Sequence, residues 1–210
     1  MHAYSSSDSR AQALGTIAFL AVLLAMAANA LTDALGIGPA WLISAPTVAA
    51  AFGLLYRFID TVAWRWPLLH RLGIIQVPVM EGRYEGYLVS SYNQTRLPIR
   101  ICIDQTWTRI AIRFDVLEPR SSTSYSITAG LGMDGHNHAR LTYTYRNQTR
   151  PGVAEADMND HDGTAEVVLD GTTGELTGRY FNFRGRQGTL ALIRSIGEPG
   201  GDPGTVRVER

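Results

Sequence analysis

The chain contains no lysine, a single cysteine and two long stretches without any charge. Its 19 basic residues are all arginines, and they balance 19 acidic residues. Beyond Glu81 the two signs nearly cancel, so no broad basic surface is available for a nucleic-acid duplex. Because Cys102 stands alone, an intrachain disulfide is excluded. It falls in a strand pattern, where we interpret it as a small hydrophobic residue.

The two uncharged stretches dominate the first quarter of the chain. No charged residue occurs between Arg10 and Asp33, or between Asp33 and Arg57. Each stretch slightly exceeds the roughly 20 apolar residues that a helix needs to cross a bilayer. They predict a two-helix transmembrane hairpin over residues 11–56. A cleaved signal peptide is the alternative, which Ala-x-Ala sequences near Ala28 leave open, although the apolar core is longer than usual.

The arginines around these stretches predict an orientation. They flank both ends of the hairpin, whereas the turn between the spans carries only Asp33. The positive-inside rule therefore places both ends in the cytoplasm. We expect residues 1–10 to form a cytoplasmic N-terminus of a multi-pass protein of a bacterial inner membrane, with the lipid bilayer as a partner. Tyr56, Trp64 and Trp66 lie just beyond the second span, where aromatic rings favour the headgroup layer, and residues 57–80 are expected to form an interfacial juxtamembrane segment.

The remainder has the alternation of a small β domain. Gly- and Asn-containing turns separate eight short segments with period-two patterns. They predict a membrane-anchored all-β protein whose residues 81–195 form an eight-stranded antiparallel up-and-down β-barrel, with a sandwich as the alternative. Both faces carry charges, which disfavours a transmembrane barrel. The Gly- and Pro-rich residues 196–210 are expected to be a disordered tail. The expected strands are Tyr84–Ser91, Leu97–Thr106, Arg109–Leu117, Ser122–Leu131, Ala139–Asn147, Thr164–Asp170, Glu175–Phe183 and Gln187–Arg194.

Several motif-like runs do not support catalysis or metal binding. Residues 130–135 match GxGxxG, but a strand rather than a helix follows them. The acidic run at 157–163 lacks EF-hand spacing. His136, His138 and His161 have no companion ligand motif. We therefore predict no enzyme activity, no catalytic residues, no metal and no cofactor.

Polar and aromatic residues on the strands are the candidates for ligand binding. Aromatic rings can stack on bases, and arginine guanidinium groups can grip phosphate. Tyrosines that pack across strands with only the hydroxyl wet are the alternative. Strand parity also places Arg109 on the opposite face unless a bulge intervenes. The candidates are Gln105, Trp107, Arg109, Ser124, Ser126, Tyr143, Tyr145, Asn147, Tyr180, Asn182, Arg184 and Arg186.

The order of these segments resembles a known family. Two spans are followed by GRYEGYL, ICIDQTWTRIAIRF, SSTSYSI, LTYTYRNQ, HDGTAEVVL and GELTGRYFNFRGRQGTLALIR. Together they resemble the two-transmembrane, β-strand-rich barrel effectors of CBASS antiphage systems. The resemblance implies a cytoplasmic receptor for a cyclic di- or trinucleotide made by a partner nucleotidyltransferase. It also implies self-association on activation and lethal disruption of the inner membrane, but it does not assign the contact residues.

Two other functions remain open from the sequence. One is a membrane-tethered lipocalin-like module that binds a lipid or apolar metabolite; the other is a structural subunit of a membrane complex. A barrel interior lined only by aliphatic side chains would favour the lipocalin-like module. An interior with arginine and tyrosine would count against it.

Overall fold

A computed structural model describes most of the 210 residues. The described residues are 1–6, 10–36, 41–92, 94–117, 122–134, 138–149 and 160–195, with residues 41–46 described by their backbone. The tail predicted to be disordered, 196–210, lies outside this set, as do residues 157–159 of the acidic run.

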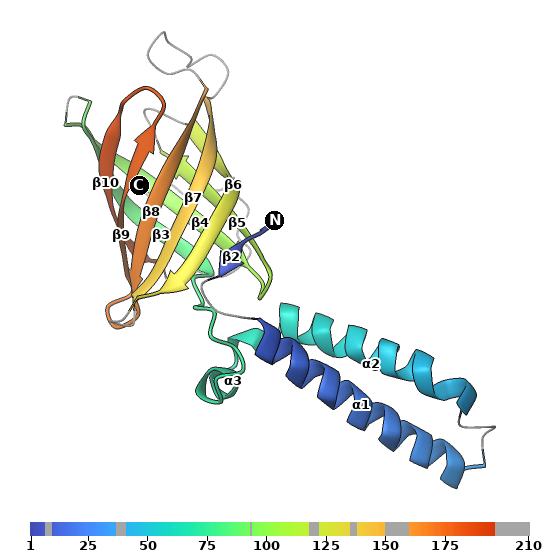
Figure 1. Cartoon of the computed structure of the whole chain (residues 1–210). Coiled ribbons are helices and arrows are strands. Elements are labelled where there is room, and N and C mark those ends of the chain that lie inside the picture. Colours follow the sequence, from blue (N-terminus) through green and yellow to red (C-terminus); the bar gives the residue numbers. More distant parts are fainter. Residues whose placement is uncertain are drawn as a thin grey trace, which may run out of the picture.

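Eight antiparallel strands form a closed barrel (Figure 1). Each strand pairs with the next in the chain, β10 pairs with β3, and the β5–β6 pairing completes the ring. The predicted antiparallel barrel is confirmed, because closure leaves no second sheet for a sandwich. The strands are β3 (Gly82–Ser90), β4 (Arg96–Gln105), β5 (Arg109–Val116), β6 (Ser122–Met133), β7 (His138–Thr149), β8 (His161–Asp170), β9 (Glu175–Asn182) and β10 (Gln187–Arg194).

The barrel closes because its strands alternate apolar and polar residues. In β4, Ile99, Ile101 and Ile103 are at most 2% exposed, and Arg100, Cys102 and Asp104, which alternate with them, are more exposed. Such a period of two sends every second side chain inward. The half of the barrel nearest the helices is filled by Ile101 and Ile103 together with Met80 and Trp107, which are also buried. Eight strands leave room for side chains and at most a small ligand, so any open space lies at the other end.

Two long helices project from the barrel side by side (Figure 1). Helix α1 spans Ala11–Ala34 and α2 spans Trp41–Thr61. The buried face of α1 consists of Ala13, Ile17, Ala21 and Ala25, spaced four apart as one face of a helix requires. Small residues at this spacing let two helix backbones approach closely.

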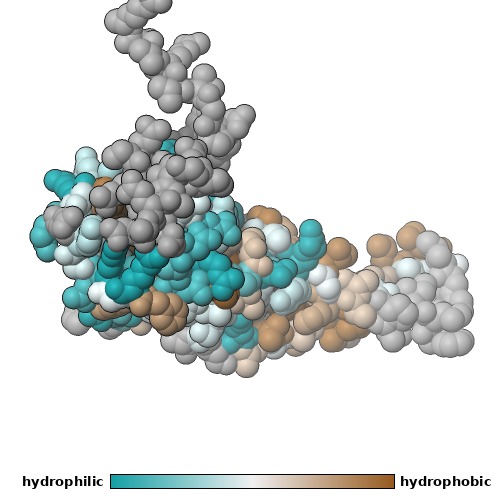
Figure 2. Space-filling model, turned by 90° about the horizontal axis from the view of Figure 1, so that it is seen from above, coloured by the Kyte–Doolittle hydropathy of each residue, from teal (hydrophilic) through white to brown (hydrophobic). Residues whose placement is uncertain are grey.

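The helix pair presents apolar side chains outward (Figure 2). Phe19, Met26 and Leu31 of α1 are each more than 60% exposed. Among the described residues, α1 is the one helix long and apolar enough to cross a membrane, by length and composition. The structure therefore contains an apolar N-terminal helix, but it does not show a two-helix transmembrane hairpin.

The junction between α2 and the barrel is more deeply packed than the sequence predicts. Helix α2 continues past residue 56 to Thr61, and its Asp60 carboxylate accepts hydrogen bonds from Thr108 N and Oγ1 at 2.9 and 2.8 Å. The short helices η1 (Ala63–Arg65) and α3 (Pro67–Arg71) follow. Trp64 is completely buried in the protein, contrary to an interfacial position, whereas Trp66 is 47% exposed.

The first six residues are also ordered against the barrel. Strand β1 (His2–Ala3) pairs with β5, and β2 (Ser5–Ser6) pairs in parallel with β6. No sequence pattern predicts these strands, because segments of two residues carry no measurable periodicity.

Candidate functional site

A pocket opens at the end of the barrel farthest from the helices. It holds about 110 Å³ of free space. Residues at the ends of seven strands contribute, because turns after every second strand meet at this end of an up-and-down barrel. We call this end the mouth. Its lining residues are Leu88, Ser90, Tyr92, Thr95, Leu97, Val116, Ser122, Asn147, Thr149, His161, Tyr180, Asn182 and Arg186.

One wall of the pocket is a buried hydrogen-bonded network. Asn147 is only 5% exposed, and its side-chain amide donates to Ser124 Oγ at 2.9 Å and to Ser122 Oγ at 3.2 Å. Across the pocket, the Tyr180 hydroxyl donates to Ser90 Oγ at 3.1 Å. Buried polar groups need such partners, and the bonds hold the Asn147 and Tyr180 side chains in fixed orientations.

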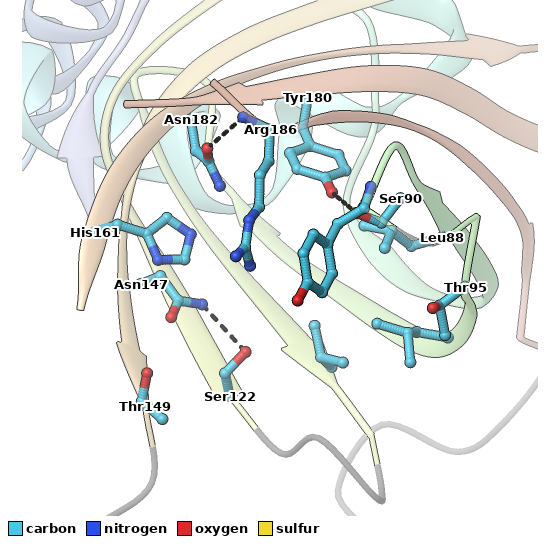
Figure 3. Close-up of a pocket in the computed structure, with 13 residues that line it drawn as sticks. Leu88, Ser90, Thr95, Ser122, Asn147, Thr149, His161, Tyr180, Asn182 and Arg186 are labelled. Atoms are coloured by element: carbon cyan, nitrogen blue, oxygen red, sulfur yellow. Dashed lines mark hydrogen bonds between the residues drawn. The ribbon is translucent and has the colours of Figure 1, made fainter. Parts of the chain in front are cut away.

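A tight turn between β9 and β10 presents the positive charge of the pocket. Asn182 Oδ1 accepts from the backbone N–H groups of Arg184 and Arg186 at 3.1 and 3.0 Å, and Gly185 takes the left-handed conformation, with φ 69°. The Arg186 side chain extends into the pocket toward His161 and Asn147 (Figure 3). Its guanidinium carbon lies 4.2 Å from the centre of the Tyr92 ring, a cation–π geometry.

Tyrosine rings lie beneath the pocket. Tyr143 and Tyr145, with Tyr180 and Ser124, line a second cavity of about 20 Å³, roughly enough for one water molecule. Burial raises the pKa of Tyr143 and of Tyr145, so both hydroxyls stay protonated and can donate. Glycine makes room for these rings. A Cβ at Gly188 would come within 2.6 Å of Tyr180 Cε1.

The structure brings together some of the sequence-predicted site residues. Asn147, Tyr180, Asn182 and Arg186 line the pocket, and Arg184 lies at its rim in a neighbouring surface groove. The next layer inward contains Ser124, Tyr143 and Tyr145.

Other predicted residues lie elsewhere. Gln105, Trp107 and Arg109 are at the helix end of β4 and β5, about 25 Å from the mouth at roughly 3.3 Å per residue. Gln105 accepts from Met80 N and Trp107 is buried there, so both support the barrel base. Ser126 lies on β6 beside β5 instead, where its Oγ accepts from Ile112 N.

Sequence reasoning missed pocket residues at the ends of strands that it had located, or just beyond the predicted bounds of those strands. Ser90, Thr95, Ser122 and His161 all adjoin turns that open on the mouth. The alternation of turns in an up-and-down barrel could have found them. By the same rule the turn containing Trp107 falls at the opposite end.

The pocket can bind an anion with aromatic parts. The 13 described residues that line it include Arg186 and His161 but no carboxylate. Arginine offers a planar fork for phosphate, and Tyr92 and Tyr180 offer rings and hydroxyls to a base. Its volume is below the roughly 300–1,000 Å³ that enclose a drug-sized ligand. A nucleotide would therefore sit partly in the pocket and partly against its rim.

Comparison with known proteins gives the same result. Residues 75–194 match a family described as "Cap15, cyclic dinucleotide receptor domain". The chain is also similar to the CD-NTase-associated protein 15 of Yersinia aleksiciae, with 31% identity over 160 residues, which cover 74% of this chain and 73% of that protein. Both matches include the whole barrel or most of the chain. The chain therefore belongs to the Cap15 family and carries its cyclic dinucleotide receptor domain.

Proposed function

We propose that this protein is a cyclic-nucleotide-activated effector of CBASS antiphage defence. The mouth of the barrel binds a cyclic dinucleotide, or a cyclic trinucleotide of similar chemistry, that a partner nucleotidyltransferase produces during infection. The observation that carries the proposal is a tyrosine-lined pocket with Arg186 inside it and no carboxylate among its described lining residues, in a barrel of the cyclic dinucleotide receptor family. The role is sensing, without catalysis.

The distribution of side chains in the barrel disfavours a lipocalin-like function. The aliphatic half near the helices is filled by residues such as Ile101 and Leu141, each 0% exposed. Free space occurs at the mouth, where serine, asparagine and arginine side chains lie. A lipid or apolar metabolite would leave these polar groups without partners, at a cost of about 1–3 kcal/mol for each buried group.

The output of the effector is disruption of the bacterial inner membrane. Helix α1 and the packed α2 cross the bilayer as a hairpin, with both termini and the barrel in the cytoplasm. The exposed apolar surface of α1 supports this placement. A single helix pair encloses no pore, so ligand drives self-association by binding the associated state more tightly than the resting one.

Dye entry into cells tests this output. Cells expressing the full chain should take up an impermeant dye only when a cyclic-nucleotide synthase is also expressed. A matched control carries Arg186→Gln, which should abolish synthase-dependent entry while the protein level is unchanged. Equal leakage with and without the synthase, or none although ligand is bound, would contradict the membrane mechanism.

A further inference from the structure

The N-terminal residues 2–6 complete the wall of the receptor barrel. Strands β5 and β6 pair directly only between residues 113–116 and 122–125, near the mouth. Toward the helices, His2 pairs with Ile110 on β5, and Ser5 pairs with Gly130 on β6. We call residues 2–6 the strap. The gap between β5 and β6 in which the strap lies is called the seam. The matched receptor domain begins only at residue 75, so the strap lies outside it.

Side chains anchor the strap in the seam. Tyr4 is 4% exposed, and its hydroxyl donates to Trp107 O at 2.7 Å. The Arg10 guanidinium lies 4.9 Å from the centre of the Tyr4 ring, and α1 begins at the next residue. The strap therefore joins the barrel wall to the first turn of α1 (Figure 1).

The same strand connects the strap with the pocket. His2 Nε2 lies 2.8 Å from Ser126 Oγ, beside the bulge in β6 between Ser126 and Thr128. Two and four residues earlier on that strand, Ser124 and Ser122 hold Asn147 in the pocket wall. Alternate residues of a strand share a face, so these three serines form one row from the pocket to the strap.

We propose that the strap and the ligand bind the barrel cooperatively through the β5–β6 seam. Both order the seam: the ligand acts at its mouth end through Asn147, and the strap acts at its helix end through Ser126. The first of the two to bind orders the seam at a cost in conformational entropy. The second binds a seam that is already ordered and therefore binds more tightly. Occupation of the pocket thus fixes α1 to the barrel. This proposal rests on the ligand class proposed above.

Two substitutions in the strap test the coupling in the full chain. His2→Ala combined with Tyr4→Ala removes both anchors. Ser5→Ala is the matched control, since the Ser5 hydroxyl donates a long hydrogen bond of 3.5 Å to Ala129 O and the substitution keeps the backbone pairing with Gly130. The probe is whichever member of a cyclic dinucleotide panel binds the wild-type chain, and calorimetry measures its affinity. We expect the double variant to bind roughly 5–150-fold more weakly and the control to bind as wild type.

Linkage provides a second, independent measurement. A synthetic peptide with the sequence MHAYSSS, added to the double variant, should bind more tightly with the probe present than without it, by the factor measured above. Hydrogen exchange of the wild-type chain should also slow at Ile110 and Ile112 when the probe binds. Equal probe affinity in the double variant and the wild type would overturn the coupling. So would unchanged exchange in the seam. Because wild-type binding is measured first, failure of the proposed ligand class is recognised separately.

Discussion

Replacing Arg186 with glutamine should weaken ligand binding far more than it weakens the fold. In the unliganded protein the guanidinium lies over Tyr92 at 4.2 Å, a contact worth about 0.5–1 kcal/mol at an exposed site. In the complex it would donate to a phosphate, and such a charged hydrogen bond is worth about 1.5–3 kcal/mol. The substitution should therefore reduce affinity about 10- to 150-fold, a larger effect than the loss of the Tyr92 contact.

The assay is titration calorimetry of the full chain in lipid nanodiscs, at low and high salt. Wild-type affinity should fall as salt rises, because ions screen the charge–phosphate attraction, and the R186Q variant should lose most of this dependence. Arg179→Gln is the matched control: Arg179 pairs with Glu166 and its side chain is 62% exposed, outside the pocket. Wild-type affinity in R186Q, or an equal loss in R179Q, would refute the assignment of Arg186 to phosphate.

Three further predictions concern stability and topology. Asp60→Ala should cost about 1–3 kcal/mol of unfolding free energy, measured by denaturant titration, because Thr108 loses the acceptor for two hydrogen bonds. Hydrogen bonds from Arg83 and from Arg100 on β4 lower the pKa of Glu85 below 4.5. The resulting stability is present above that ordinary value and is lost as the pH falls through the lowered one, so Glu85→Gln should flatten the acid side of a Tm–pH curve; an unchanged slope would contradict this. A reporter active only in the periplasm should be silent when fused after Ser195; activity would place the barrel on the wrong side of the membrane.

Most of the barrel could be predicted from the sequence because its signals are local. The segment predicted at Arg109–Leu117 is the strand Arg109–Val116. It lies between the predicted turns and contains the alternating isoleucines that predicted it. The strap could not be predicted. Its strands have two residues each, and its partners lie more than 100 residues away in the chain. Its stability comes from one buried ring, that of Tyr4, and from the gap that β5 and β6 leave.

The sequence predicts which site residues face the barrel interior, but it does not predict their position along the barrel axis. Alternation correctly put Tyr143, Tyr145 and Asn147 on an inward face, where the structure places them. It also put Gln105 on an inward face, but this side chain accepts a hydrogen bond from Met80 N and donates one to Pro78 O at the barrel base. Period-two patterns report which side of the sheet a residue takes, whereas its depth follows from which end of the barrel its turn occupies.

Binding of a cyclic dinucleotide to the full chain tests the central claim most directly. Thermal unfolding is followed in nanodiscs against a panel of cyclic di- and trinucleotides, with linear dinucleotides of the same bases as controls. A ligand at 100 times its dissociation constant should add about 2.7 kcal/mol of stability, and Arg186→Gln should remove about half of that gain or more at the same ligand concentration. If no cyclic nucleotide stabilises the protein, or if the linear controls stabilise it equally, the barrel mouth is not a cyclic-nucleotide receptor.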